Sequence, residues 1–151
     1  MNVANGKYTT IRTLRGNITV SGQRKTLIVD DGRLTHGHRI TSIRMWPARS
    51  GQVGDISCTL ATTGVAASLP MDASNNGQIG WVFSPFTTSQ GNGFESVLDP
   101  NHIVVEELVI VADFGAAFTD GVNYMITLQP IELTDSESAV VQIKARQQNL
   151  V

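Results

Sequence analysis

Apolar and polar residues alternate along much of the chain, and this period of two is the pattern of β-strands with one buried face. The segment 122–129 is the clearest case, because large apolar residues fall on one of its faces and polar residues on the other. We expect this strand to cover a core on one side and to meet water or a partner on the other. The expected core face holds Val122, Tyr124, Ile126 and Leu128, and the opposite face holds Asn123, Thr127 and Gln129.

The alternating pattern recurs throughout the chain, while helical periodicity is almost absent before the C-terminal segment. Clusters of Gly, Pro, Asn and Asp separate the apolar segments, and Asp31-Gly32 is a strong turn signal. This spacing predicts an all-β protein of about eight strands, arranged as a sandwich or a closed barrel. The predicted strands are 8–16, 17–22, 25–32, 39–46, 54–63, 79–86, 102–114 and 122–133.

The segment 102–114 is apolar on both faces beyond Glu106 and Glu107. Leu108 and Ile110 fall on one face, and Val109 and Val111 on the other. A strand of this kind either lies centrally between two packed layers or has its second face covered by another subunit.

Two long segments, 61–78 and 87–101, are rich in Gly, Ser, Asn and Ala and are predicted as loops. They contain few large apolar groups that could hold them against the domain. Loops of this length are usually functional or ordered by a neighbour.

The one strong helix signal lies at the C-terminus, in residues 134–151. Thr134 and Glu137 form a capping box, and Val140 and Ile143 supply a short apolar stripe followed by the basic Arg146. A helix this short is marginal alone in water, so we expect it to dock on its own sandwich or on another protein, with the last residues as a tail.

Length and composition indicate one domain with a core of its own, because the chain has 151 residues. The single cysteine, Cys58, excludes an internal disulfide and is interpreted as a small apolar residue.

The net charge of −2 gives no overall electrostatic field that would attract nucleic acid or an anionic membrane. Most of the 11 Lys and Arg residues lie in the first third and the acids lie later, which could guide a head-to-tail contact between copies or reflect solvated strand faces. Neither a secretory signal nor a membrane-spanning apolar run is visible, so the protein is expected to be made in the cytoplasm and not secreted.

His36 and His38 stand two residues apart at the start of a predicted strand, and this spacing would point both imidazoles to one face. His102 is the only other histidine. The metal-binding pattern of the cupin family fails here at its carboxylate, since Ser42 and Ile43 stand where the Glu is required. We interpret the three histidines as low-probability metal ligands, expect no cofactor, and expect ordinary hydrogen bonds from them instead.

No phosphate-binding loop, nucleophile elbow or base paired with a nucleophile is visible, so the sequence does not indicate an enzyme. Four aromatic residues could form a platform for sugars, although core packing is the simpler interpretation. These residues are Trp46, Trp81, Phe83 and Phe86, of which Trp81 and Phe83 share a strand face.

The entry Asp99-Pro100-Asn101-His102 into an apolar strand, and the later Asn123-Tyr124-Met125 strand that runs into an acidic cap and a short polar helix, resemble small proteins encoded by bacteriophages, notably marine ones. The likeness covers the last third of the chain well and the middle third more loosely. It implies a virion component, a jelly-roll-like antiparallel β-sandwich on the capsid, and it transfers no catalytic residue.

We therefore expect a virion structural protein, a capsid decoration, minor capsid or vertex component that contacts copies of itself and other capsid proteins. The alternatives are a glycan-binding module of a phage fibre or spike and, less favoured, a metal-dependent β-barrel enzyme. The residues expected at interfaces are Val109, Val111, Val140, Ile143 and Arg146.

Overall fold

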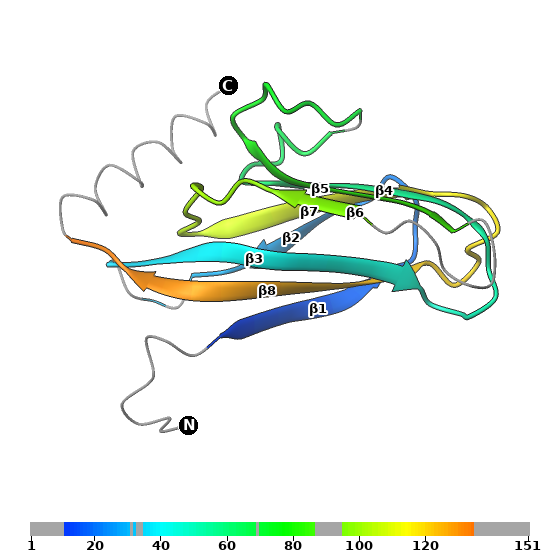
Figure 1. Ribbon diagram of the computed structural model, residues 1–151, viewed down its shortest axis with the longest axis horizontal. Coiled ribbons are helices and arrows are strands. Elements are labelled where there is room, and N and C mark those ends of the chain that lie inside the picture. The colour runs from blue at the N-terminus through cyan, green and yellow to red at the C-terminus, as the bar shows by residue number, and fades with distance from the viewer. Residues whose placement is uncertain (1–10, 31, 33–34, 69, 87–94, 135–151) are drawn as a thin grey trace.

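Eight strands form two antiparallel sheets that pack face to face (Figure 1). The computed structural model describes residues 11–30, 32, 35–68, 70–86 and 95–134. The C-terminal helix expected over 134–151, with Val140, Ile143 and Arg146, lies outside the described residues apart from Thr134. The strands are β1 (Arg12–Ile18), β2 (Arg24–Ile28), β3 (His36–Pro47), β4 (Gly54–Ala61), β5 (Gln78–Phe86), β6 (Glu95–Leu98), β7 (Glu107–Phe114) and β8 (Val122–Glu132).

The strand order is that of a jelly roll. One sheet has the order β1-β8-β3 and the other β2-β7-β4-β5-β6. Rolling up one long antiparallel ribbon pairs β1 with β8, β2 with β7 and β4 with β5, and then brings β8 beside β3 and β7 beside β4. Only β6 departs from this scheme, because it pairs with β5 while remaining in contact with β3. The predicted jelly-roll-like β-sandwich is confirmed.

The predicted division into strands is wrong in two places, and the strand predicted over 102–114 begins only at Glu107. The segments 8–16 and 17–22 were predicted as separate strands, but a single strand, β1, runs through Gly16 and Asn17. Gly16 pairs with Tyr124 of β8 and therefore continues the ladder. A Cβ added at this position would lie 2.5 Å from the Tyr124 hydroxyl oxygen, so only glycine fits here. The glycine makes room for the aromatic ring.

The second error is β6, which falls inside the segment 87–101 that was predicted as a loop. This strand is only 4 residues long and pairs with β5 alone. So short a strand at a sheet edge carries too few residues for an alternating pattern to be recognised.

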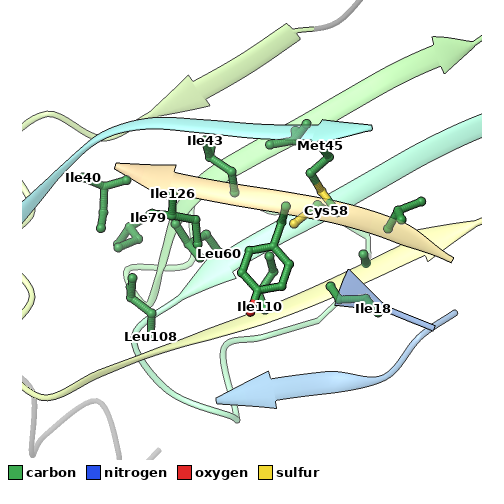
Figure 2. Packing of buried hydrophobic residues seen from close by; sticks show 14 of the residues in the cluster. Ile18, Ile40, Ile43, Met45, Cys58, Leu60, Ile79, Leu108, Ile110 and Ile126 are labelled. Carbon is green, nitrogen blue, oxygen red and sulfur yellow. The ribbon is translucent and has the colours of Figure 1, made fainter. Parts of the chain in front are cut away.

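The core fills the space between the sheets. Ile43 and Met45 of β3 face Cys58 and Leu60 of β4 across this space (Figure 2). The predicted faces of β8 are confirmed, since its core-facing residues are buried and the alternate residues are not. The core is closed near one end by Gly121, whose φ of 81° and whose approach to the Ile18 carbonyl oxygen both exclude a side chain.

A second, smaller apolar cluster lies on the outer face of the five-stranded sheet. Val109 and Val111 of β7 are buried there beneath Ala66 and Ala67, which belong to the loop between β4 and β5. In Figure 1 this loop rises above the five-stranded sheet. The second apolar face of β7 is thus covered from within the chain, and a partner could reach these two valines only if the loop moved away. Among the described residues, no helix has the length and apolar character needed to cross a membrane.

Candidate functional site

The loop between β4 and β5 is fastened to the sandwich by Gln78, the first residue of β5. The Gln78 amide nitrogen donates to the carbonyl oxygen of Ala66 at 3.0 Å, and its amide oxygen accepts from the backbone nitrogen of Asp72 at 2.8 Å. Because Gln78 is 3% exposed, these hydrogen bonds form away from water. They fix the loop at two points, Ala66 in its first half and Asp72 in its second half. The loop is therefore ordered by its own chain, although its composition favours ordering by a neighbour.

Further hydrogen bonds fix the base and the flank of the loop. The backbone nitrogen of Thr62 donates to the carbonyl oxygen of Gly77 at 2.8 Å, and Arg24 Nε donates to the carbonyl oxygen of Ala67 at 2.7 Å. Ser74 donates to the Asp72 carboxylate from both its hydroxyl and its backbone nitrogen, which lowers the pKa of Asp72. The result is a rigid wall beside the start of β5.

Trp81 is held against this wall by the same glutamine. Its indole Nε1 donates to Gln78 Oε1 at 2.9 Å, which fixes the edge of the ring. Val97 lies opposite Trp81 on β6 and is 50% exposed. The tryptophan therefore lies on the outer face of the five-stranded sheet, with an exposed apolar neighbour beside it.

A groove of about 900 Å³ lies between the loop, the start of β5, the β6 edge and the connection from β6 to β7. This volume is at the upper end of the range of about 300–1,000 Å³ that is typical of small-molecule sites. The lining combines apolar side chains with amides and one carboxylate, and none of the described residues that form it is Lys or Arg. The lining residues are Thr63, Val65, Ala66, Ala73, Asn75, Asn76, Gly77, Gln78, Trp81, Val97, Leu98, Asp99 and His102.

The histidines do not come together as a metal site. His36 and His38 are buried at the start of β3, whereas His102 lines the groove. Nε2 of His38 lies 2.8 Å from Arg12 Nη1, and a guanidinium only donates, so this imidazole nitrogen is the acceptor. The lone pair of this nitrogen is thus directed at a cation and is not open to a metal ion. Within the described part of the chain, no group of three or more His, Cys, Asp or Glu residues is placed to hold a metal ion.

Cys58 packs in the core as expected of a small apolar residue. It is fully buried, and burial raises the pKa of its thiol. A thiol that resists ionisation and has no access to solvent is a poor nucleophile.

The aromatic residues occupy several environments. Trp46 and Phe83 are 40% and 38% exposed, so the expected packing in the core is wrong for both. Trp81 is partly buried and lines the groove, while the side chain of Phe86 lies outside the described residues. The sequence indicated Trp81 as a candidate but gave no sign of Gln78, whose role depends on loop residues far from it in the strand pattern.

No family model, curated protein or solved structure matches this chain.

Proposed function

We propose that the chain is a bacteriophage virion structural protein, a capsid decoration, minor capsid or vertex component that acts through protein–protein contacts. The observation that carries the proposal is the open, apolar edge formed by β1 and β2. The assignment to a phage particle is supported by the resemblance of residues 99–102 and 123–125 to phage proteins. In this proposal the protein has no catalytic role or cofactor, binds neither nucleic acid nor membrane, and reaches the virion from the host cytoplasm.

β1 and β2 are neighbouring outer strands of the two sheets. Each is the terminal strand of its sheet, so one row of backbone groups on each strand has no partner strand among the described residues. Two side-chain hydrogen bonds join the edges: Arg12 Nη1 donates to the Val29 carbonyl oxygen at 2.7 Å, and Lys25 Nζ donates to the Asn17 carbonyl oxygen at 3.3 Å. The two edges therefore form one side of the sandwich.

Three exposed apolar residues belong to these two strands or flank them. Ile11 directly precedes β1, Val20 lies in the turn from β1 to β2, and Ile28 ends β2. Their exposed fractions are 63%, 59% and 66%, respectively. Exposed apolar groups beside unpaired strand backbone favour the addition of a strand from another protein.

The basic residues of β2 do not shield the edge, although edge charges often do so in monomeric proteins. Arg24 is turned toward the loop carbonyl of Ala67. Lys25 lies over the ring of Tyr124, with Nζ 5.4 Å from the ring centroid. Both cations are engaged within the chain, and Thr26 and Ile28 remain on the exposed side of the strand.

The opposite end of the same sheet is β6, which exposes Glu95 and Ser96. We infer that β2 of one copy packs beside β6 of the next, because the two are the terminal strands of the same sheet and each can extend the hydrogen-bonded ladder of the other. A head-to-tail contact of this kind generates a ring or an extended array, either of which suits attachment to a capsid.

Mass spectrometry of phage particles purified from the host of this gene tests the proposal. We expect the chain in the particles at many copies, in constant ratio to the major capsid protein through successive density gradients. Loss of the protein during purification, with the protein recovered only from the host lysate, would contradict a virion role.

A further inference from the structure

We propose that the groove beside Trp81 binds a neutral oligosaccharide. This inference goes beyond the assembly role and does not depend on it, because the proposed contact between copies uses the backbone edge of β6, whereas the groove lies beside Trp81 on the outer face of the same sheet. It rests on three features of the groove: a fixed aromatic ring, oriented polar side chains, and the absence of basic residues among the described residues that line it.

The first feature is the aromatic ring. The hydrogen bond from Trp81 Nε1 to Gln78 Oε1 fixes the ring in the groove without using its faces. Sugar rings present faces of C–H groups, and these pack on aromatic faces as other apolar groups do. Val65 and Val97, which are 64% and 50% exposed, supply further apolar surface in the lining.

The second feature is the set of polar side chains. Asn75 Oδ1 accepts from the backbone nitrogen of Gly77 at 3.0 Å, and Asp99 Oδ1 accepts from the backbone nitrogen of Asn101 at 3.0 Å. Each bond fixes the direction of a side chain that lines the groove. An amide both donates and accepts, and a carboxylate accepts at two oxygens, which matches the hydroxyl groups of a sugar.

The third feature is charge. Within the part of the chain that the structure describes, the lining contains one carboxylate, that of Asp99, and no Lys or Arg. Phosphates, sulfates and uronates are usually bound through basic side chains or clusters of backbone N–H groups. A neutral ligand is therefore favoured over an acidic polysaccharide or a nucleic acid.

The wall of the groove is also fixed before any ligand binds. Its wall is held by the buried Gln78 and by the contact of Ala66 and Ala67 with β7. A site that is rigid before binding loses little conformational entropy when the ligand enters. The size of the groove, about 900 Å³, suits several linked sugars better than one.

A tryptophan fluorescence titration tests the proposal. In the Trp46→Phe variant of the full chain, Trp81 is the only indole, because the chain has 2 tryptophans. The probes are neutral hexasaccharides of glucose, galactose, mannose and N-acetylglucosamine, with oligomers of galacturonate as the acidic comparison. We expect at least one neutral hexasaccharide to shift the Trp81 emission saturably at millimolar concentration or below, and the galacturonate oligomers to leave it unchanged.

Two variants connect the signal to the groove, with binding measured by calorimetry in otherwise unaltered protein. Trp81→Ala is expected to weaken binding at least tenfold, and Asp99→Asn, which retains the Oδ1 acceptor, is expected to weaken it about tenfold. Trp46→Ala is the matched control, because Trp46 lies on the other sheet and does not line the groove, and its affinity is expected to equal that of the wild type.

The proposal is overturned if no neutral hexasaccharide binds, or if binding persists unchanged in both Trp81→Ala and Asp99→Asn. Tighter, salt-sensitive binding of galacturonate oligomers would also overturn it. A peptide that binds in the groove of a protein that binds none of the sugars would overturn it as well. Circular dichroism of each variant establishes that a loss of affinity occurs in folded protein.

Discussion

The guanidinium of Arg12 lies 2.8 Å from Nε2 of His38, and the two side chains meet across β8, which separates β1 from β3. The same Arg12 nitrogen donates to the carbonyl oxygen of Val29, which follows β2 of the other sheet. His38 also exchanges two backbone hydrogen bonds of 2.8 Å with Val104, which precedes β7. These contacts join the two sheets at one end of the sandwich.

Replacing Arg12 should therefore destabilise the fold. Arg12→Met leaves the Val29 carbonyl oxygen and His38 Nε2 without this donor, and an unsatisfied buried acceptor costs about 1–3 kcal/mol. Urea unfolding followed by circular dichroism measures the loss. Arg15→Met is the matched control, because Arg15 is exposed on the same strand, and its effect should stay within about 0.5 kcal/mol. Equal stability of the two variants would show that the Arg12 contacts contribute nothing.

Metal removal should leave the protein unchanged, because Arg12 occupies Nε2 of His38 and the described residues hold no group of three or more potential ligands. We expect the thermal midpoint to be the same with and without a chelator. Elemental analysis of protein purified without a histidine tag should give far less than one metal ion per chain. A stoichiometric metal together with a chelator-sensitive midpoint would disprove this interpretation of the histidines.

Thr59 provides a test of the covered face of the five-stranded sheet. It lies between Trp81 and Val111 in the ladder and is fully buried, and its hydroxyl has no hydrogen-bond partner among the described residues. Thr59→Val removes an unsatisfied polar group at nearly constant shape, so the free energy of unfolding should rise by about 1 kcal/mol.

Thr63→Val is the matched comparison for Thr59→Val. The Thr63 hydroxyl accepts from the backbone nitrogen of Ala66 at 3.1 Å within the groove wall, so its loss should lower the free energy of unfolding by about 1 kcal/mol. Chemical denaturation of both variants measures the pair. Destabilisation by Thr59→Val as large as that by Thr63→Val would mean that the Thr59 hydroxyl is bonded in solution.

The sheet faces could be predicted from the sequence because alternation reports burial directly. Val122 and Tyr124 of β8 lie on the predicted core face, and Val109 and Val111 of β7 lie on the predicted second apolar face. The identity of the cover over these valines could not be predicted, since it depends on two alanines, Ala66 and Ala67, in a loop with no periodic pattern.

The groove was less accessible from sequence than the fold. The sequence indicates Trp81 as part of a possible sugar platform, but the placement of its ring depends on Gln78. A single buried glutamine gives no local pattern, because its hydrogen bonds reach Ala66 and Asp72, which the chain brings near only after folding. The metal hypothesis could not be resolved from sequence for a similar reason, as Arg12 and His38 lie on different strands.

Sedimentation equilibrium of the purified chain over a wide concentration range tests the central claim most directly, with Ile28→Lys and Val53→Lys as a matched pair. Both residues are exposed, at 66% and 43%, but only Ile28 lies on the β1–β2 edge. We predict that the wild type and Val53→Lys associate with increasing concentration and that Ile28→Lys remains a monomer. A wild-type chain that stays monomeric at the highest concentration would contradict the proposal that this edge assembles copies of the protein.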